Sequence, residues 1–140
     1  MNSGTTDGER VAQAAAGLVG ARFRLHGRNP ATGLDCIGLA AVALARAGLR
    51  AVAPHGYALR NSSIERALGA LAGCDLAPAA PPAHAGDIVL VAPGPAQHHL
   101  LVATGAGRFV HAHAGLRRVV VLSGPLPWPI LRLWRPGKKD

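Results

Sequence analysis

The stretch GLDCIGLAAVALARA, residues 33–47, decides how the rest of the sequence is interpreted. From Cys36 to Ala47 it is apolar on nearly every side, and Gly48 follows it, which is typical of a helix buried inside a fold. Asp35 stands where an N-cap residue accepts hydrogen bonds from the first turn of a helix. The stretch therefore predicts an interior helix that begins at Cys36.

Two further helices are predicted around this one. Thr6 and Glu9 have the spacing of a capping box, and residues 11–19 then form a short helical run. The same spacing recurs in the next part of the chain, where it predicts a helix over residues 64–72. The proline-rich segment 77–85 predicts irregular structure and ends the helical half.

The second half of the chain predicts strands. Its apolar or alternating runs are short, are separated by glycine and proline, and are spaced as an antiparallel meander over residues 87–91, 99–104, 108–111, 119–122 and 130–134. Helices followed by strands indicate an α+β fold, with the N-terminal helices packed on one face of a C-terminal antiparallel sheet. The length predicts one domain over residues 1–140.

The composition narrows the classes of partner. Fifteen Lys and Arg against seven Asp and Glu give a formal charge of +8, which attracts polyanions. The arginines are dispersed and the aromatic residues form no stacking series, so nucleic-acid binding is not predicted. No apolar run approaches the roughly 20 residues that cross a bilayer, and the first residues lack the regions of a signal peptide. Neither membrane insertion nor a signal peptide is therefore expected.

Cys36 is the first candidate for chemistry. At the first turn of a helix, unpaired backbone N–H groups and the positive end of the helix dipole stabilise a thiolate and lower the pKa of the thiol. A small buried hydrophobic residue is the plainer interpretation of any cysteine. Cys74 follows the end of a predicted helix, where the dipole disfavours a thiolate, and is predicted to be inert.

The predicted strands offer histidines to a cysteine nucleophile, which needs one within hydrogen-bond reach. A turn centred on Gly105 would set His99 opposite His111, and a turn one residue later would set it opposite His113. Either register places two imidazoles on one face of the hairpin, while His98 points to the opposite side. The spacing leaves the choice between His111 and His113 open.

The same histidines permit metal chemistry. A His-x-His pair on one strand with a third histidine from its neighbour is ligand geometry for a catalytic zinc ion. The nearest well-placed carboxylate, Asp87, is more simply interpreted as the start of a strand, and a zinc site leaves Cys36 without a role. A zinc-dependent hydrolase that uses the histidine cluster is therefore kept as an alternative.

The order and spacing of these segments resemble the NlpC-type bacterial cell-wall cysteine peptidases, compact relatives of the papain fold. The matching segments are Gly27 and residues 20–23, 33–39, 86–89, 99–102 and 107–112. The resemblance implies that Cys36 is the nucleophile, His99 the general base and His111 the residue that orients the base. It also implies hydrolysis of amide bonds in peptidoglycan stem peptides, with no metal or organic cofactor. A basic surface fits an anionic wall polymer.

Two positions depart from the pattern of the family. Phe23 stands where many members have a tyrosine that grips the free amino end of the substrate, and Ile37 stands where they have serine. Phe23 and Asp35 are still predicted to contact the substrate, with Asp35 pairing with a substrate amine. The Cys36 backbone N–H is expected to meet the oxyanion, and the sequence identifies no second donor.

The Asp-Cys-Ile-Gly-Leu form of the motif, residues 35–39, looks like members encoded with phage tails and gene-transfer particles. Such a particle would deliver the enzyme from the bacterial cytoplasm to the cell wall, which suits the absence of a predicted signal peptide. The expected partners are therefore peptidoglycan or muropeptides and phage-tail-like particle proteins. A non-catalytic structural or binding component of such a particle is the second interpretation.

Overall fold

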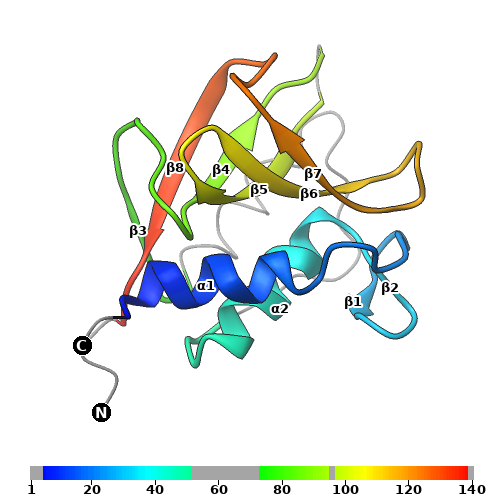
Figure 1. The fold of residues 1–140 in the computed structure, drawn as a ribbon, viewed down its shortest axis with the longest axis horizontal. Coiled ribbons are helices and arrows are strands. Elements are labelled where there is room, and N and C mark those ends of the chain that lie inside the picture. Colours follow the sequence, from blue (N-terminus) through cyan, green and yellow to red (C-terminus); the bar gives the residue numbers. More distant parts are fainter. Residues whose placement is uncertain (1–4, 52–72, 95–96, 139–140) are drawn as a thin grey trace.

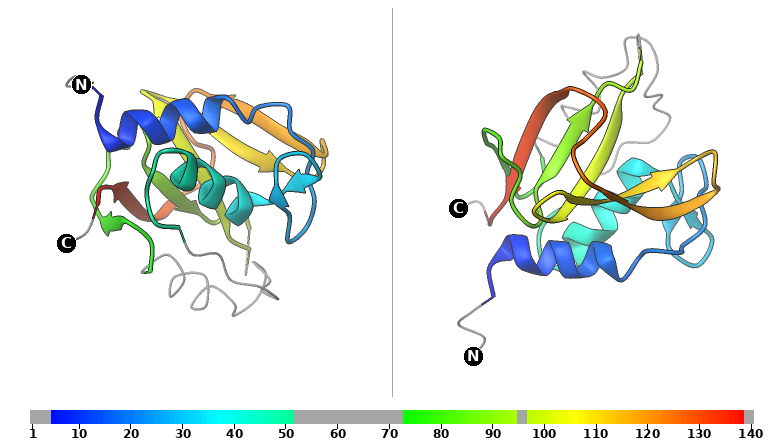
Figure 2. Two further views of the ribbon diagram at one scale, coloured as in Figure 1. Left: turned by 90° about the horizontal axis from the view of Figure 1, so that it is seen from below. Right: turned by 45° about the horizontal axis from the view of Figure 1, so that its top comes forward.

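The computed structural model describes residues 5–51, 73–94 and 97–138. The helix predicted over residues 64–72 lies outside them. Two helices, α1 (Asp7–Ala16) and α2 (Cys36–Arg46), lie side by side below a six-stranded sheet (Figure 1). Two further views show both helices on the same side of the sheet (Figure 2). The predicted α+β class is confirmed.

The sheet is antiparallel throughout, and its spatial order is β3-β8-β4-β5-β6-β7. Its strands are β3 (Leu76–Pro78), β4 (Ile88–Val91), β5 (His99–Gly105), β6 (Arg108–His113), β7 (Arg118–Ser123) and β8 (Ile130–Pro136). A separate pair, β1 (Arg28–Asn29) and β2 (Gly33–Leu34), immediately precedes α2. Strands β4 to β7 form the predicted meander.

The position of the last strand was predicted wrongly. β8 does not continue the meander beside β7 but pairs with β4, with Ile88 opposite Trp134. This arrangement buries Leu133 and Trp134, which an edge strand beyond β7 would leave largely open to solvent. The segment between β7 and β8 therefore carries the chain back across the sheet.

The prediction of irregular structure over residues 77–85 was wrong at its start. Ala77 and Pro78 belong to β3, where they pair with Arg135 and Trp134 of β8. Proline cannot donate to the ladder, but β3 is an edge strand, so one side of its backbone needs no partner strand.

Local hydrogen bonds explain where the helices begin. The Thr6 hydroxyl accepts from the Glu9 N–H at 3.0 Å, and the Glu9 carboxylate accepts from the Thr6 N–H at 2.9 Å, which is the predicted capping box. Asp35 caps α2 by accepting from the Gly38 N–H at 2.8 Å, also as predicted. α1 ends at Ala16, three residues before the predicted end.

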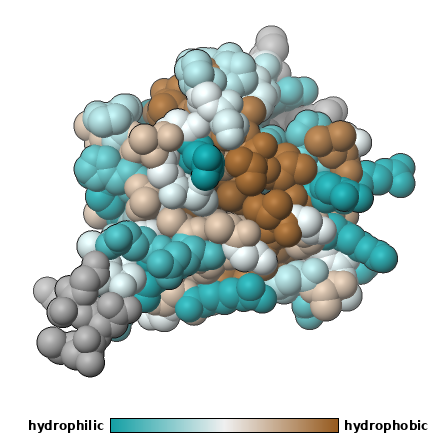
Figure 3. All heavy atoms as spheres, viewed as in Figure 1, coloured by the Kyte–Doolittle hydropathy of each residue, from teal (hydrophilic) through white to brown (hydrophobic). Residues whose placement is uncertain are grey.

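The main core lies between the helices and the sheet. Its buried side chains are Leu, Ile, Val and Ala from both helices and from the strands, with Cys36 and Cys74 among them. A smaller cluster covers the opposite face of the sheet. Val121 on β7 is exposed, and apolar surface gathers near the centre of the face seen in Figure 3. In the described residues, neither helix is long and apolar enough to span a membrane.

Candidate active site

A cavity of about 770 Å³ lies where the start of α2 meets the start of β5 and the end of β6. Its lining contains every residue to which the sequence predicted a catalytic or substrate-binding role, and one aromatic residue that it did not: Phe23, Asp35, Cys36, His99, His111 and Trp128. The long-range packing of helix on sheet therefore brings the predicted site residues to one place.

The start of α2 is held by the carboxylate of Asp35. Its Oδ1 accepts from the Gly38 N–H at 2.8 Å and from Arg28 Nη1 at 3.0 Å, and its Oδ2 accepts from the His26 N–H at 2.8 Å. These bonds tie the loop before α2 to the first turn of the helix, where Cys36 lies. Both oxygens carry bonds within the chain, and the predicted bond from Asp35 to a substrate amine stays a prediction.

Glycine at position 38 lets this loop pack directly on the helix. A Cβ atom at Gly38 would lie 1.9 Å from the carbonyl oxygen of Gly27, so any larger residue would push the loop away. Because the same loop carries Arg28 and His26, the small residue contributes to the position of Asp35 and of the neighbouring thiol.

The thiol of Cys36 is buried at the start of the helix. Burial raises its pKa to about 12, and the nearby Asp35 carboxylate also raises it, while the backbone N–H groups of Leu100 and Ile37 act in the opposite direction. The prediction that the helix start lowers the pKa of this thiol was therefore wrong, because desolvation outweighs the favourable helix amides. The Leu100 contact places the sulfur against β5, one residue after His99.

The first residue of β5 and the fourth residue of β6 form an imidazole pair. His99 Nε2 and His111 Nδ1 lie 3.0 Å apart, within hydrogen-bond distance, and their ring planes are inclined at 80°. Because Nε2 of His99 is used in this contact, Nδ1 is the nitrogen that remains to take a proton from a thiol.

The structure also shows why His111 rather than His113 meets His99. The pairs Val102–Val110 and Ala103–Phe109 follow the later of the two turn positions, the one for which the sequence predicts His113 opposite His99. His113 Nδ1, however, accepts a hydrogen bond from the Leu116 N–H at 3.0 Å. His99 therefore bonds to its diagonal neighbour on the same face, which is within reach of a long side chain.

Both imidazoles of the pair favour the neutral form. Burial lowers the pKa of His99 to about 4, and the neighbouring His111 and His113 lower it further in the same direction. The pKa of His111 is also lowered, by burial and by His113. For Nδ1 of a neutral His99 to act as a base, the ring must carry its proton on Nε2. His99 would then donate a hydrogen bond from Nε2 to His111 Nδ1, and a neutral His111 would carry its proton on Nε2.

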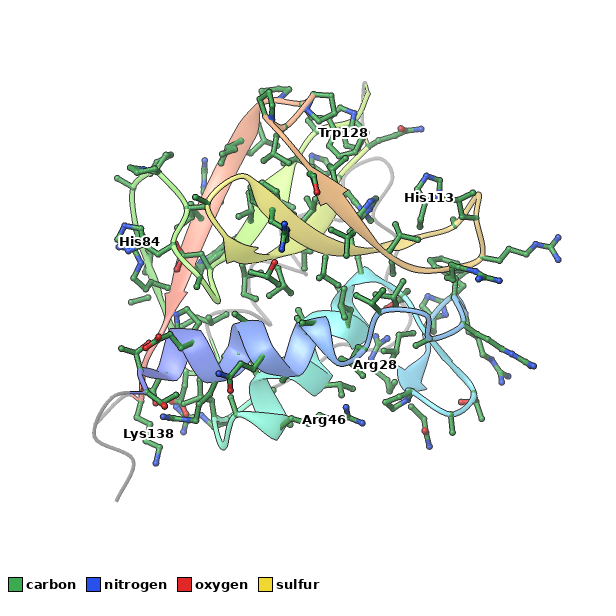
Figure 4. The ribbon with its side chains drawn as sticks, viewed as in Figure 1. Arg28, Arg46, His84, His113, Trp128 and Lys138 are labelled. Carbon is green, nitrogen blue, oxygen red and sulfur yellow. The ribbon has the colours of Figure 1, made fainter. Side chains whose placement is uncertain are left out.

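Trp128 covers the imidazole pair and was not predicted as a site residue. Its ring centroid lies 6.4 Å from those of both His99 and His111, in edge-on arrangements. Figure 4 shows Trp128 near the start of β8 and His84 well away from it, beside the loop that follows β3. The signal in the sequence was Pro127-Trp128-Pro129, an aromatic residue fixed between two prolines.

The structure gives the zinc alternative no ligand set within the described residues, where no three His, Cys, Asp or Glu side chains are grouped to hold a metal ion. His113 turns its Nδ1 to the backbone of Leu116. Asp87 is fully buried and accepts from Arg135 Nε and Nη2 at 3.1 and 2.8 Å. It directly precedes β4 and does not line the cavity.

Comparison with solved structures identifies the fold. NlpC2 and NlpC1 from Trichomonas vaginalis superpose with TM-scores of 0.69 and 0.67, at 20% and 23% sequence identity, over 95% and 96% of this chain. The P60 domain of an antigen from M. avium subspecies paratuberculosis matches at a TM-score of 0.59 and 19% identity, over 96% of both chains. The chain therefore has the NlpC/P60 fold, as predicted.

The extent of these matches differs. The chain spans 49% and 47% of the two Trichomonas proteins. The NlpC/p60 domain of the peptidoglycan hydrolase SagA matches at a TM-score of 0.57 and 23% identity, over 83% of this chain and 88% of that one. No protein-family model and no curated protein sequence matches the chain.

Proposed function

We propose that this protein is a cysteine peptidase of the NlpC/P60 type, which hydrolyses amide bonds in peptidoglycan stem peptides with Cys36, His99 and His111. The observation that carries the proposal is the 3.0 Å contact between His99 and His111 in the cavity that also contains Cys36. Solved structures with the same fold include a domain of a peptidoglycan hydrolase, which supports the choice of substrate.

The first half of the proposed reaction makes a thioester. His99 Nδ1 takes the proton of the Cys36 thiol, and the sulfur forms a bond to the scissile carbonyl carbon while the carbonyl electron pair moves to oxygen. His111 accepts the hydrogen bond from His99 Nε2 and so stabilises the imidazolium that results. When the tetrahedral intermediate collapses, the carbon–nitrogen bond breaks and the amine leaves with the proton from His99.

The second half consumes water. His99 removes a proton from a water molecule, the oxygen attacks the thioester carbon, and the carbon–sulfur bond breaks to release a carboxylic acid and restore the thiol. Because burial raises the pKa of Cys36 and lowers that of His99, the resting pair is a neutral thiol and a neutral imidazole. Proton transfer is therefore coupled to the attack on the substrate.

The proposal also includes the partner, the place of action and the route. The partner is peptidoglycan, the place of action is the cell wall, and a phage-like particle delivers the enzyme. The chain contains fifteen Lys and Arg but only seven Asp and Glu, and this basic composition supports an anionic polymer as substrate.

The two cysteines allow a matched test of the proposal. Purified muropeptides are digested with the wild type, Cys36→Ala and Cys74→Ala, and the fragments are identified by mass spectrometry. Cys74 is as deeply buried as Cys36 but is absent from the cavity lining, so Cys74→Ala is expected to cleave like the wild type. Cys36→Ala is expected to produce no fragments. Cleavage by Cys36→Ala, or equal losses in both variants, would contradict the proposal.

A further inference from the structure

Two segments that are far apart in the sequence meet beside the cavity and bring four arginines together. Residues 20–24 lie along the start of β7, where the Phe23 N–H donates to the Arg117 carbonyl at 3.0 Å and the Val119 N–H donates to the Ala21 carbonyl at 2.8 Å. Figures 1 and 2 show the turn between β6 and β7 at the same end of the molecule as β1 and β2. The exposed arginines of these two segments are called the arginine surface below: Arg22, Arg24, Arg117 and Arg118.

The backbone pairing sets the arginine surface at the edge of the cavity. Arg22 and Arg118 are directly opposite each other in an antiparallel bridge, so their side chains share a face. Phe23 packs against the main core, whereas Arg22 and Arg24 on either side of it are exposed, as alternation along an extended segment requires. Arg118 is also opposite His113, which lines the cavity. The arginine surface therefore borders the cavity.

The charge of this surface is not neutralised within the described part of the chain, where none of its four guanidinium groups forms an ion pair. The carboxylates in that part are engaged elsewhere, since Glu9 caps α1 and the aspartates pair with other arginines: Asp7, Asp35, Asp75 and Asp87. Like charges directly opposite each other on neighbouring strands are destabilising, so the bridge between Arg22 and Arg118 costs free energy in the protein alone. An anion bound between the two guanidinium groups would remove that cost.

The position of the surface indicates an anion that belongs to the substrate. Guanidinium groups bind carboxylates through paired hydrogen bonds. Under the proposed function the cavity receives one stem peptide, and the polymer carries further stem peptides with carboxylates of their own. Leu25 and Leu116 are exposed near the arginines, but Leu25 lines the cavity, and a single further leucine gives little affinity for a lipid bilayer.

We propose that the arginine surface binds carboxylates of stem peptides that neighbour the one in the cavity, and so holds polymeric peptidoglycan against the site. The role rests on the proposed function, because it takes peptidoglycan to be the substrate. It assigns the attraction for an anionic polymer to four residues beside the cavity, and it accounts for two arginines that are directly opposite each other without a carboxylate between them.

Binding to insoluble peptidoglycan tests the surface without catalysis. The Cys36→Ala protein is mixed with sacculi from which accessory polymers have been removed by acid, and the bound fraction is measured by sedimentation at low and high salt. In this background, Arg22→Gln/Arg118→Gln removes the opposed pair. The matched control, Arg46→Gln/Arg132→Gln, removes the same charge from exposed residues that do not line the cavity. Sacculi whose carboxylates have been amidated show whether carboxylates are the ligand.

The proposal expects the two double variants to differ. Arg22→Gln/Arg118→Gln should bind intact sacculi at least about fivefold more weakly than the Cys36→Ala parent at low salt, whereas the control should stay within about twofold. The difference should disappear at high salt and on amidated sacculi. The midpoint of thermal unfolding of Arg22→Gln/Arg118→Gln should equal or exceed that of the parent, because a repulsive pair has been removed.

Three results would overturn the proposal. Equal binding by the two double variants would show that only net charge matters. An undiminished difference on amidated sacculi would show that carboxylates are not the ligand. Tighter binding of the Cys36→Ala protein to phosphatidylglycerol vesicles than to sacculi, lost in Arg22→Gln/Arg118→Gln, would assign the surface to a bilayer. Digestion of muropeptides that carry one stem peptide tests the catalytic proposal separately, because that assay does not depend on neighbouring stem peptides.

Discussion

Asp35 and Asp87 are two buried carboxylates with similar chemistry and different consequences. Each stands immediately before a regular element, each accepts from backbone N–H groups, and each pairs with an arginine. Asp35 lies at the start of α2 and lines the cavity, whereas Asp87 lies before β4 and does not. The comparison separates residues that shape the candidate site from residues that only hold the fold.

The partners explain the difference. Asp35 bonds the first turn of its own helix and the loop that precedes it, so its position sets that of Cys36. Asp87 bonds Arg135 on β8 and the backbone N–H of His84 at 2.7 Å, so it ties β8 to the turn before β4. A buried carboxylate paired with a partly exposed arginine thus holds the helix of the candidate site in one region and the order of strands in the other.

The largest effect is expected at the pair that lies away from the cavity. Arg135→Ala leaves the fully buried Asp87 without its cation. Because the Arg135 side chain is 37% exposed, solvent screens part of the pair, and we expect the free energy of unfolding to fall by about 2 kcal/mol. Urea denaturation measures the loss. The kcat of the folded fraction should stay at the wild-type value, because neither residue lines the cavity.

Arg132→Ala is the matched control for this change. Arg132 lies on the same strand but is exposed, and among the described residues its side chain bonds only the neighbouring Leu131 carbonyl. We expect its free energy of unfolding within about 0.5 kcal/mol of the wild type. If Arg135→Ala is as stable as Arg132→Ala, the pair with Asp87 contributes nothing and the comparison fails.

A smaller loss of stability, accompanied by a loss of activity, is expected at Asp35. Asp35→Ala removes the cap of α2 and should cost about 1–2 kcal/mol of unfolding free energy. It also frees the loop that holds the start of the helix, so the rate of muropeptide cleavage should fall in protein that is still folded. Chemical denaturation and cleavage assays on the same preparation measure both quantities.

The cap of the other helix gives the control for Asp35. Thr6→Ala removes the cap of α1 and should cost about 1 kcal/mol, but α1 carries no residue of the cavity. Cleavage by Thr6→Ala should therefore equal that of the wild type. Equal effects of the two cap variants on cleavage would show that Asp35 has no special connection with the site.

The smallest effect is expected from mild acid. A general base with an ordinary histidine pKa near 6.5 loses about tenfold in its neutral fraction between pH 7 and 5.5. The pKa of His99 is lowered to about 4, chiefly by burial, so its neutral form persists over this interval. We expect kcat/KM for muropeptides to change less than about twofold between these pH values.

The same shift has a consequence for stability. The unfolded chain protonates His99 near its ordinary pKa, while the folded chain does so only near pH 4. Stability is therefore complete above pH 6.5 and declines as the pH falls toward 4. A tenfold loss of kcat/KM by pH 5.5, with no change in folded fraction, would contradict the neutral imidazole pair.

Much of the fold could be predicted because its signals are local. The capping box at Thr6, the cap at Asp35 and the strand runs of β4 to β7 each depend on residues within a few positions of one another. The return of β8 to β4 could not be predicted in the same way. It depends on which distant edge buries Leu133 and Trp134, and short windows of sequence do not encode that choice.

For the candidate site, the sequence predicted which residues take part, but it did not predict which of them contact one another or how deeply they are buried. Cys36 at a helix start and the histidines of one hairpin follow from local periodicity and turns. The partner of His99, the cover provided by Trp128 and the raised pKa of the thiol depend on burial and on contacts between distant segments. Desolvation and register are properties of the packed molecule, which is why only the tertiary structure could decide them.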